Sequence, residues 1–299
     1  MTSDPTRGVG PLRLLAHAKL NLSLRVLARE ESGYHSIETI LLRLELADCV
    51  ELEVTVERGV RLEVTGNYQV PTDSSNLCWR AAEALGREVS HRGGVRIGLD
   101  KRIPVGAGLG GGSADAAAVL RGLNELWGSP LDNAALVRLA GEIGSDVPFG
   151  LCKSTMALAW ERGRRFLPLD APSPRPVLIV VPGYPIGAGE AYGWLSEDRS
   201  AGLVERPGPG FLPRTAELSE NSVLESLAIN DLAQPVFRRH PELEGVRDAL
   251  TERGAEIALL CGSGSCVAGL FPDESVLDSV AASFSRVEGL STILTRTLR

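Results

Sequence analysis

Apolar and polar residues alternate along the stretch LRLLAHAKLNLSLRVL, which occupies residues 12–27. Aliphatic or small side chains take every second position, at Ala16, Ala18, Leu20, Leu22, Leu24 and Val26. Polar side chains lie between them, at His17, Lys19, Asn21, Ser23 and Arg25. A period of two predicts a β-strand with one buried face. On this pattern alone, Lys19 is a solvated lysine on the polar face.

A period of two for strands and a period of about 3.6 residues for helices assign the rest of the chain. Strands are predicted at residues 37–46, 49–65, 94–100, 176–182, 255–261, 265–271 and 291–298, with two more in 155–169 that turn at Gly163. Helical spacing predicts helices at residues 76–88, 113–127, 131–143, 190–197, 229–239, 242–253 and 273–285. Residues 144–151 and 197–221 are predicted loops, and residues 1–10 a loose tail. Strands and helices mix in both halves, which predicts an α+β fold with largely antiparallel sheets.

The segment PSPRP, which begins at Pro172, is predicted to end a first domain at residues 1–172 and to open a second at residues 173–299. The net charge of −7 argues against a nucleic-acid partner. No apolar run approaches the ~20 residues of a membrane span, so no membrane partner is expected. The five cysteines are widely spaced and the four histidines scattered, which predicts reduced thiols, a cytoplasmic location and no protein-built metal site.

A glycine-rich run, PVGAGLGGGSADAAAVL at residues 104–120, stands between a predicted strand and a predicted helix. Its GAGLGG portion satisfies the dinucleotide-binding pattern G-x-G-x-x-G. That fold requires a second parallel strand after the helix, whereas here another helix follows. A P-loop is excluded as well, because no Gly-Lys-Ser/Thr follows the glycines.

The run nevertheless has the chemistry of an anion site. Glycines allow close backbone approach, and the N-terminus of the following helix carries unpaired N–H groups and partial positive charge. Ser113 can cap that helix or reach a phosphate or its metal. Asp115 would repel a phosphate and must therefore point away or face a cation. The alternative is a glycine-rich turn that only packing requires.

These residues resemble the ATP-binding motif of the GHMP kinases, which include galactokinase, homoserine kinase and mevalonate kinase. AKLNL at residues 18–22, GYHSIET at 33–39 and GSDVPF at 144–149 match one branch of that family closely. NDL at residues 230–232 and GSGS at 262–265 extend the match into the second half. The resemblance implies a first domain like ribosomal protein S5 domain 2 and a ferredoxin-like second domain, with the active site between them.

The resemblance also implies an activity and its residues. The branch transfers the γ-phosphate of ATP, with Mg²⁺, to the 2-hydroxyl of a cytidine-diphosphate-linked methylerythritol, in the non-mevalonate route to isoprenoids. Lys19 then matches the catalytic lysine and Asp146 the proposed general base. Asn21, Tyr34, His35 and Tyr192 are expected to bind the substrate, with aromatic rings against the cytosine. The expected ATP-binding residues are Pro104, Val105, Gly106, Ala107, Gly108, Leu109, Gly110, Gly111, Gly112, Ser113 and Ala114.

Two departures from the branch leave its substrate open. Gly187-Ala188-Gly189 replaces a usual Ser-Thr-Ala, and Cys261 replaces a usual serine before Gly262. One alternative is a kinase of the same family for another small alcohol, although a substrate without a base would not need Tyr34 and His35. Another is a catalytically silent ligand sensor, which would be expected to have lost Lys19 or Asp146. We expect a small-molecule partner and a monomer or weak homodimer.

Overall fold

The structure is a computed structural model that describes residues 10–29, 35–90, 93–161, 163, 165–205 and 221–299. The predicted tail, apart from Gly10, and most of the predicted loop at 197–221 lie outside these residues. The chain forms two compact units that interleave along the sequence. The first comprises Met1–Ala18, Ala47–Val105 and Gly111–Cys152, and the second comprises Lys19–Leu46, Gly106–Gly110 and Lys153–Arg299. The domains at residues 1–172 and 173–299 stay a prediction.

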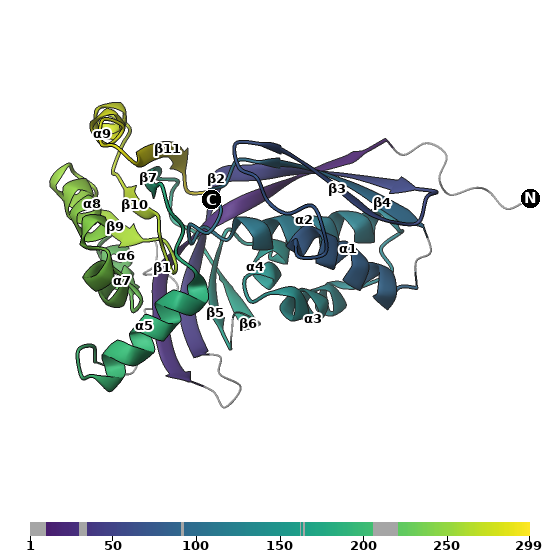
Figure 1. The fold of residues 1–299 in the computed structure, drawn as a ribbon, viewed down its shortest axis with the longest axis horizontal. Coiled ribbons are helices and arrows are strands. Elements are labelled where there is room, and N and C mark those ends of the chain that lie inside the picture. The colour runs from purple at the N-terminus through teal and green to yellow at the C-terminus, as the bar shows by residue number, and fades with distance from the viewer. Residues whose placement is uncertain (1–9, 30–34, 91–92, 162, 164, 206–220) are drawn as a thin grey trace, which may run out of the picture. The chain divides into compact units, whose positions relative to one another are not determined.

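The first unit is a sheet covered by helices (Figure 1). Its strands are β3 (Gly59–Gly66), β4 (Gly94–Lys101), the first part of β1 (Leu12–Arg29) and the last part of β2 (His35–Thr55). β4 pairs antiparallel with β2 and parallel with β3. The helices are α1 (Leu77–Glu88), α2 (Gly111–Leu126), α3 (Asn133–Ile143) and α4 (Val147–Leu151). Leu52, Ile97 and Leu120 are among the buried residues of the core between sheet and helices.

Helix boundaries in this unit follow local capping where a cap exists. Asn76 caps α1, because its side chain accepts a hydrogen bond from the N–H of Cys78, and Asp132 caps α3 in the same way. α2 begins at Gly111, two residues before the predicted start, so Ser113 lies inside the first turn and is not the N-cap.

The predicted loop at residues 144–151 is wrong over its second half. Residues 147–151 form the short helix α4, with Pro148 in its first turn. Five residues are too few to display helical periodicity, and packing supplies what the pattern lacks. Val147, Phe149 and Leu151 are buried, and Gly150 leaves no room for a Cβ beside the Ala117 side chain of α2.

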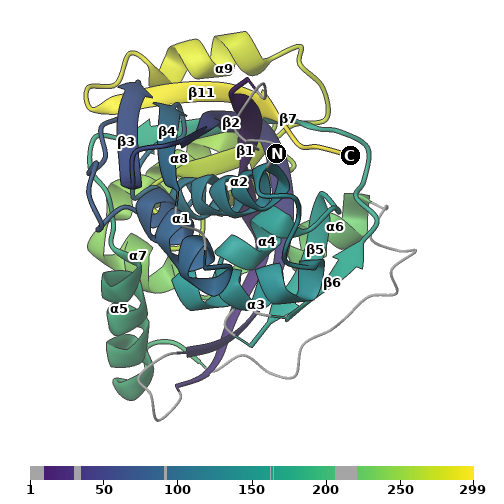
Figure 2. The ribbon, with the colours of Figure 1, turned by 90° about the vertical axis from the view of Figure 1, so that its right-hand side faces the viewer.

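The second unit contains a four-stranded antiparallel sheet in the order β11-β7-β10-β9. Its strands are β7 (Pro176–Pro182), β9 (Ile257–Leu260), β10 (Val267–Leu270) and β11 (Leu290–Arg296). The helices of the unit are α5 (Ala188–Ser200), α6 (Asn221–Leu227), α7 (Ala233–Arg239), α8 (Pro241–Glu252) and α9 (Leu277–Phe284). Figure 2 shows α9 running along β11. Every residue of β7 is buried, as its uninterrupted apolar sequence predicts.

The second unit also holds most of β1 (Leu12–Arg29), the first part of β2, and the strands β5 (Met156–Trp160), β6 (Arg165–Leu169) and β8 (Ile229–Asn230). β5 pairs antiparallel with both β2 and β6. The helix predicted to start at residue 229 is wrong at that end, because residues 229–230 pair in parallel with β1 and α7 starts only at Ala233. The α+β class with mostly antiparallel strands is confirmed.

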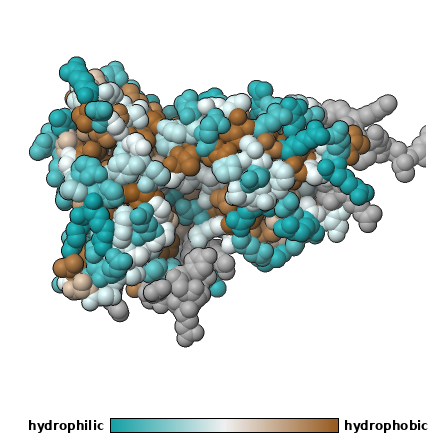
Figure 3. Space-filling view, viewed as in Figure 1, coloured by the Kyte–Doolittle hydropathy of each residue, from teal (hydrophilic) through white to brown (hydrophobic). Residues whose placement is uncertain are grey.

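On the face seen in Figure 3, hydrophobic and hydrophilic residues are interspersed. Within the part of the chain that the structure describes, no helix has the length and apolar character needed to cross a bilayer.

Candidate active site

Lys19 lies in the middle of β1 and is buried, with 7% of its surface exposed. Its Nζ donates to Asn21 Oδ1 at 2.6 Å and to the carbonyl oxygen of Gly108 at 3.0 Å. The expectation that the polar face of β1 is solvated is therefore wrong here, since Asn21 and Ser23 are also buried. A buried ammonium is stable only when it is paired or hydrogen-bonded, and these contacts supply that.

A chain of hydrogen bonds orients the side chain of Asn21. Its Nδ2 donates to Thr39 Oγ1 at 2.8 Å, and the Thr39 hydroxyl in turn donates to the carbonyl oxygen of Ser23 at 2.6 Å. The amide oxygen of Asn21 is thereby turned toward Lys19. A cavity of about 130 Å³ continues along this side of the strand, lined by Ser23, Thr39, Arg25 and Glu38 among others.

The glycines at positions 106, 108 and 110 all adopt positive φ, between 67° and 75°. A Cβ at Gly106 would lie 2.7 Å from Pro185 Cβ, and one at Gly110 would lie 2.8 Å from Lys19 Cε. A Cβ at Gly108 would overlap the carbonyl oxygen of Cys261. Fold packing therefore requires these three glycines, whatever ligand the loop holds.

Gly112 differs from those three glycines. It is exposed, it lies in the first turn of α2, and the nearest atom to a Cβ there would be Leu77 Cδ1 at 3.7 Å. Ser113 and Ala114 beside it are half-buried, and the first turn carries no acidic residue. The N-terminus of this 16-residue helix thus offers backbone N–H groups and partial positive charge.

Asp115 faces a cation, the ammonium of Lys101, as its chemistry predicts. It is buried and accepts a hydrogen bond from Lys101 Nζ at 2.9 Å. Lys101 also donates to Asp48, so one ammonium serves two buried carboxylates. Burial raises the pKa of Asp115 to about 8, against the opposing effect of Lys101 and with a further increase from Asp48. The sequence did not identify Lys101 as the cation that faces Asp115, or Asp48 as the second carboxylate.

The turn between β9 and β10 borders Lys19, and sequence reasoning assigned it no site role. A Cβ at Gly262 would lie 2.9 Å from Gly108 O, 3.1 Å from Asn21 Oδ1 and 3.3 Å from Lys19 Nζ. Asn230 holds this turn, because its Nδ2 donates to the carbonyl oxygen of Gly262 at 2.7 Å.

His35 and Tyr192 lie together, with ring centroids 5.1 Å apart and planes inclined by 22°. His35 Nε2 is also 3.2 Å from Ser196 Oγ, and both aromatic residues are half-buried. Tyr34, the other expected stacking residue, lies outside the described residues.

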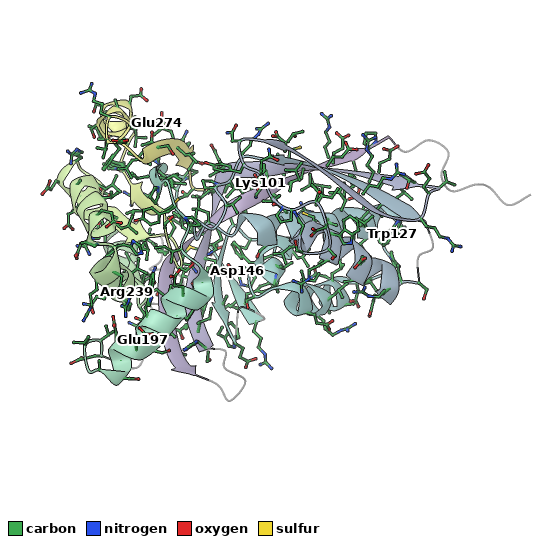
Figure 4. The ribbon with its side chains drawn as sticks, in the orientation of Figure 1. Lys101, Trp127, Asp146, Glu197, Arg239 and Glu274 are labelled. Carbon is green, nitrogen blue, oxygen red and sulfur yellow. The ribbon has the colours of Figure 1, made fainter. Side chains whose placement is uncertain are left out.

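Helix α5, which carries Tyr192, is anchored at its far end. Arg239 on α7 donates to Glu197 at 3.0 Å and to Asp198 at 3.1 Å (Figure 4). At its start, α5 is capped by Gly187 without a side-chain hydrogen bond. The Ser-Thr-Ala to Gly-Ala-Gly departure therefore falls at the first turn of this helix.

Asp146 immediately precedes α4 and is half-buried (Figure 4). Its side chain makes no capping hydrogen bond to that helix, so its carboxylate is not committed to holding the helix N-terminus. Asp146 belongs to the first unit and Lys19 to the second.

Among the described residues, no group of three or more His, Cys, Asp or Glu side chains could hold a metal ion. Mg²⁺ that accompanies a nucleotide is commonly held by phosphates, water and one or two carboxylates.

Comparison with known proteins assigns the chain to a family. The family model for the GHMP kinases N terminal domain matches residues 76–154, and the model for the GHMP kinases C terminal domain matches residues 216–288. A 4-diphosphocytidyl-2-C-methyl-D-erythritol kinase from Geobacter sp. (strain M21) is 37% identical over 96% of this chain and 99% of its own length. This chain belongs to the GHMP kinase family.

Two further relatives support the same placement of this GHMP kinase. The 4-diphosphocytidyl-2-C-methyl-D-erythritol kinase of Anaeromyxobacter dehalogenans (strain 2CP-C) is 40% identical over 95% of this chain and 90% of its own. The crystal structure of a 4-(cytidine 5'-diphospho)-2C-methyl-D-erythritol kinase superimposes with a TM-score of 0.77 at 35% identity, covering 96% of this chain and 99% of that one. The predicted GHMP kinase fold is confirmed.

Proposed function

We propose that this chain transfers the γ-phosphate of ATP to the 2-hydroxyl of 4-diphosphocytidyl-2-C-methyl-D-erythritol, a step of non-mevalonate isoprenoid biosynthesis. The observation that carries the proposal is the 37% identity, over 96% of this chain and 99% of the relative, to a kinase of that name. The stacked pair His35 and Tyr192 adds support, because aromatic rings suit the face of a nucleobase.

ATP is proposed to bind along residues 104–114. The exposed Gly112 and half-buried Ser113 at the start of α2 support this, since a helix N-terminus favours a phosphate. Mg²⁺, when bound with the nucleotide, would neutralise phosphate charge.

Lys19 and Asp146 are proposed to serve the transfer itself. Phosphoryl transfer requires positioning and charge neutralisation more than covalent chemistry. The ammonium of Lys19, held by Asn21 and the carbonyl oxygen of Gly108, is suited to stabilise negative charge on the attacking oxygen. The carboxylate of Asp146 would accept, or orient, the hydroxyl proton of the substrate.

Asn21, Tyr34, His35 and Tyr192 are proposed to bind the cytidyl substrate. Support for the aromatic part comes from the stack of His35 on Tyr192, whose ring centroids lie 5.1 Å apart. A base could be read there by stacking and by hydrogen bonds to its edge.

The test is an ADP-release assay with Mg²⁺-ATP and the cytidyl substrate, run beside mevalonate and homoserine. Turnover with the cytidyl compound alone is expected. Turnover with mevalonate or homoserine but not with the cytidyl compound would establish another small alcohol as the substrate. Binding of ATP and the cytidyl compound without ADP release would establish a silent sensor.

Asp146→Asn provides the residue-level test. Because the amide cannot accept the proton, kcat should fall by about 100- to 10,000-fold. ATP affinity should stay within twofold, since the substitution is isosteric. Near-normal turnover would remove Asp146 from the mechanism. Glu142→Gln, an exposed carboxylate on the preceding helix α3, is the matched control and should turn over normally.

We also propose a cytoplasmic enzyme with a small-molecule partner, without nucleic-acid or membrane partners, that is a monomer or weak homodimer. The acidic net charge of −7 supports the absence of nucleic acid. Light scattering across a concentration series would report the assembly state, and a stable larger oligomer would contradict it.

A further inference from the structure

A buried cluster of three ionisable side chains lies beneath the start of α2. Lys101, at the end of β4, has only 3% of its side chain exposed, and its partners Asp48 and Asp115 have 0% and 2%. Lys101 Nζ donates to both carboxylates. Burial lowers the pKa of Lys101, but the two carboxylates outweigh this and raise it above the ordinary lysine value. The ammonium therefore stays charged. Burying three such groups costs desolvation free energy, and an apolar core at this place would not have that cost.

The cluster ties together the two ends of the glycine run. On the entry side, Asp48 Oδ1 accepts from the backbone N–H of Arg102 at 2.5 Å and of Ile103 at 2.8 Å. On the exit side, Asp115 is part of α2. Gly111, the first residue of that helix, is so close that a Cβ there would lie 2.8 Å from Lys101 Nζ.

We propose that Lys101 is a positioning residue for the phosphate loop, which it holds by joining Asp48 at the entry of the glycine run to Asp115 at its exit. The two contacts of Lys101, with Asp48 and with Asp115, fix the spacing between residues 103 and 111. They also fix the direction of the first turn of α2. Lys101 makes no contact with substrate in this role. The proposal rests on the proposed function only in that ATP binds this loop.

The two carboxylates have different roles. Asp48 accepts three hydrogen bonds, from Lys101 and two backbone N–H groups. Asp115 has one donor, and its Oδ1 accepts no hydrogen bond from the described residues. The thiol of Cys78, on α1, also faces Asp115, and burial raises its pKa as well.

This difference gives a pH signature. With a pKa raised to about 8 by burial, the carboxyl group of Asp115 is mostly protonated at pH 7. As pH rises through about 8, Asp115 ionises and adds a negative charge beneath the anion-binding turn. ATP affinity should therefore fall between pH 7 and pH 9.

The experiment measures Mg²⁺-ATP affinity by isothermal titration in the absence of any alcohol substrate. Lys101→Met should weaken ATP binding by about 10- to 100-fold, because it removes the charge-assisted hydrogen bonds that hold both ends of the loop. Its KM for the cytidyl substrate should stay within twofold. Arg102→Met is the matched control, since Arg102 is exposed and one residue away, and it should leave both values within twofold. A folded Lys101→Met protein that binds ATP within twofold of the unmodified protein would overturn the proposal.

Asp115→Asn keeps the proposal testable if Lys101→Met does not fold. The amide preserves shape and a hydrogen-bond acceptor but cannot ionise. The unmodified protein should lose ATP affinity between pH 7 and 9, and Asp115→Asn should hold it constant. Equal slopes for the two proteins would overturn the proposal. Because ATP binding is read without the alcohol, failure of the cytidyl substrate assay leaves this result unaffected.

Discussion

Replacing Asn230 by alanine should lower both the free energy of unfolding and kcat. Its Nδ2 donates to the carbonyl oxygens of Leu260 at 3.0 Å and Gly262 at 2.7 Å, and its Oδ1 accepts from the N–H of Leu232 at 2.9 Å. Each hydrogen bond contributes about 0.5–1.5 kcal/mol net. Loss of three should therefore lower the free energy of unfolding by ~2–4 kcal/mol.

The effect on turnover follows from what the turn borders. Gly262 stands against Gly108 O, Asn21 Oδ1 and Lys19 Nζ, with a Cβ there within 3.3 Å of all three. A turn that loses its anchor lets Lys19 take other positions. Misplacement on the order of 1 Å costs up to ~100-fold, so kcat should fall by about tenfold or more.

Asn124→Ala is the matched control. Asn124 makes a comparable pair of bonds, to the carbonyl oxygen and from the N–H of Leu131, both at 3.0 Å. It should lose ~1–3 kcal/mol of unfolding free energy while kcat stays within twofold. Urea unfolding gives the stabilities, and ADP release at 20–25 °C gives kcat. If the two variants keep equal kcat, the link from Asn230 to Lys19 is refuted.

Two further outcomes follow from the same geometry. Tyr192→Leu should raise KM for the cytidyl substrate by roughly 5- to 100-fold, the value of a base–aromatic stack, while KM for ATP holds within twofold; equal increases in both would contradict a base-binding role. Burial raises the pKa of the Cys261 thiol to about 12, so iodoacetamide at pH 8 should label the half-exposed Cys49 first and Cys261 only after unfolding, as peptide mass spectrometry would report.

Local signals in the sequence predicted local structure well. The alternation at residues 12–27 identified β1, and the side chains of Asn76 and Asp132 mark the starts of α1 and α3. The helix predicted from residue 229 failed at its start, because pairing with Ser23 and Leu24, some 200 positions away, holds residues 229–230 extended. Secondary structure that depends on a distant partner leaves no periodic trace.

The candidate site was predictable only in part, for the same reason. Lys19, Asp146 and the glycine run were predicted from a family resemblance and local chemistry, and their roles stay a prediction. The burial of Lys19 was not predicted, because the residues that contact it, Gly108 and Gly262, lie far along the chain. Lys101 lies 53 positions from Asp48, and nothing in either neighbourhood identifies the other as its partner.

Two glycine substitutions can separate the packing and phosphate explanations that the sequence left open. Gly108→Ala should cost several kcal/mol, about 1–2 kcal/mol of it from a φ of +75° and the rest from overlap with the Cys261 carbonyl. Gly112→Ala should leave stability unchanged or raise it by up to ~1 kcal/mol, since it is helical and has space for a Cβ.

ATP affinity is then the deciding measurement. If a phosphate approaches the exposed N–H groups at the start of α2, the methyl group of Gly112→Ala stands in its path and should weaken ATP binding by about tenfold or more, although the fold is intact. Gly128→Ala, at an exposed glycine just beyond the other end of α2, is the control for an added methyl group at a position that binds no ligand. Its positive φ of 81° should lower stability by about 1–2 kcal/mol, but ATP affinity should not change. Gly112→Ala with unchanged ATP affinity would mean that the glycine run serves packing, and that the phosphates are held elsewhere.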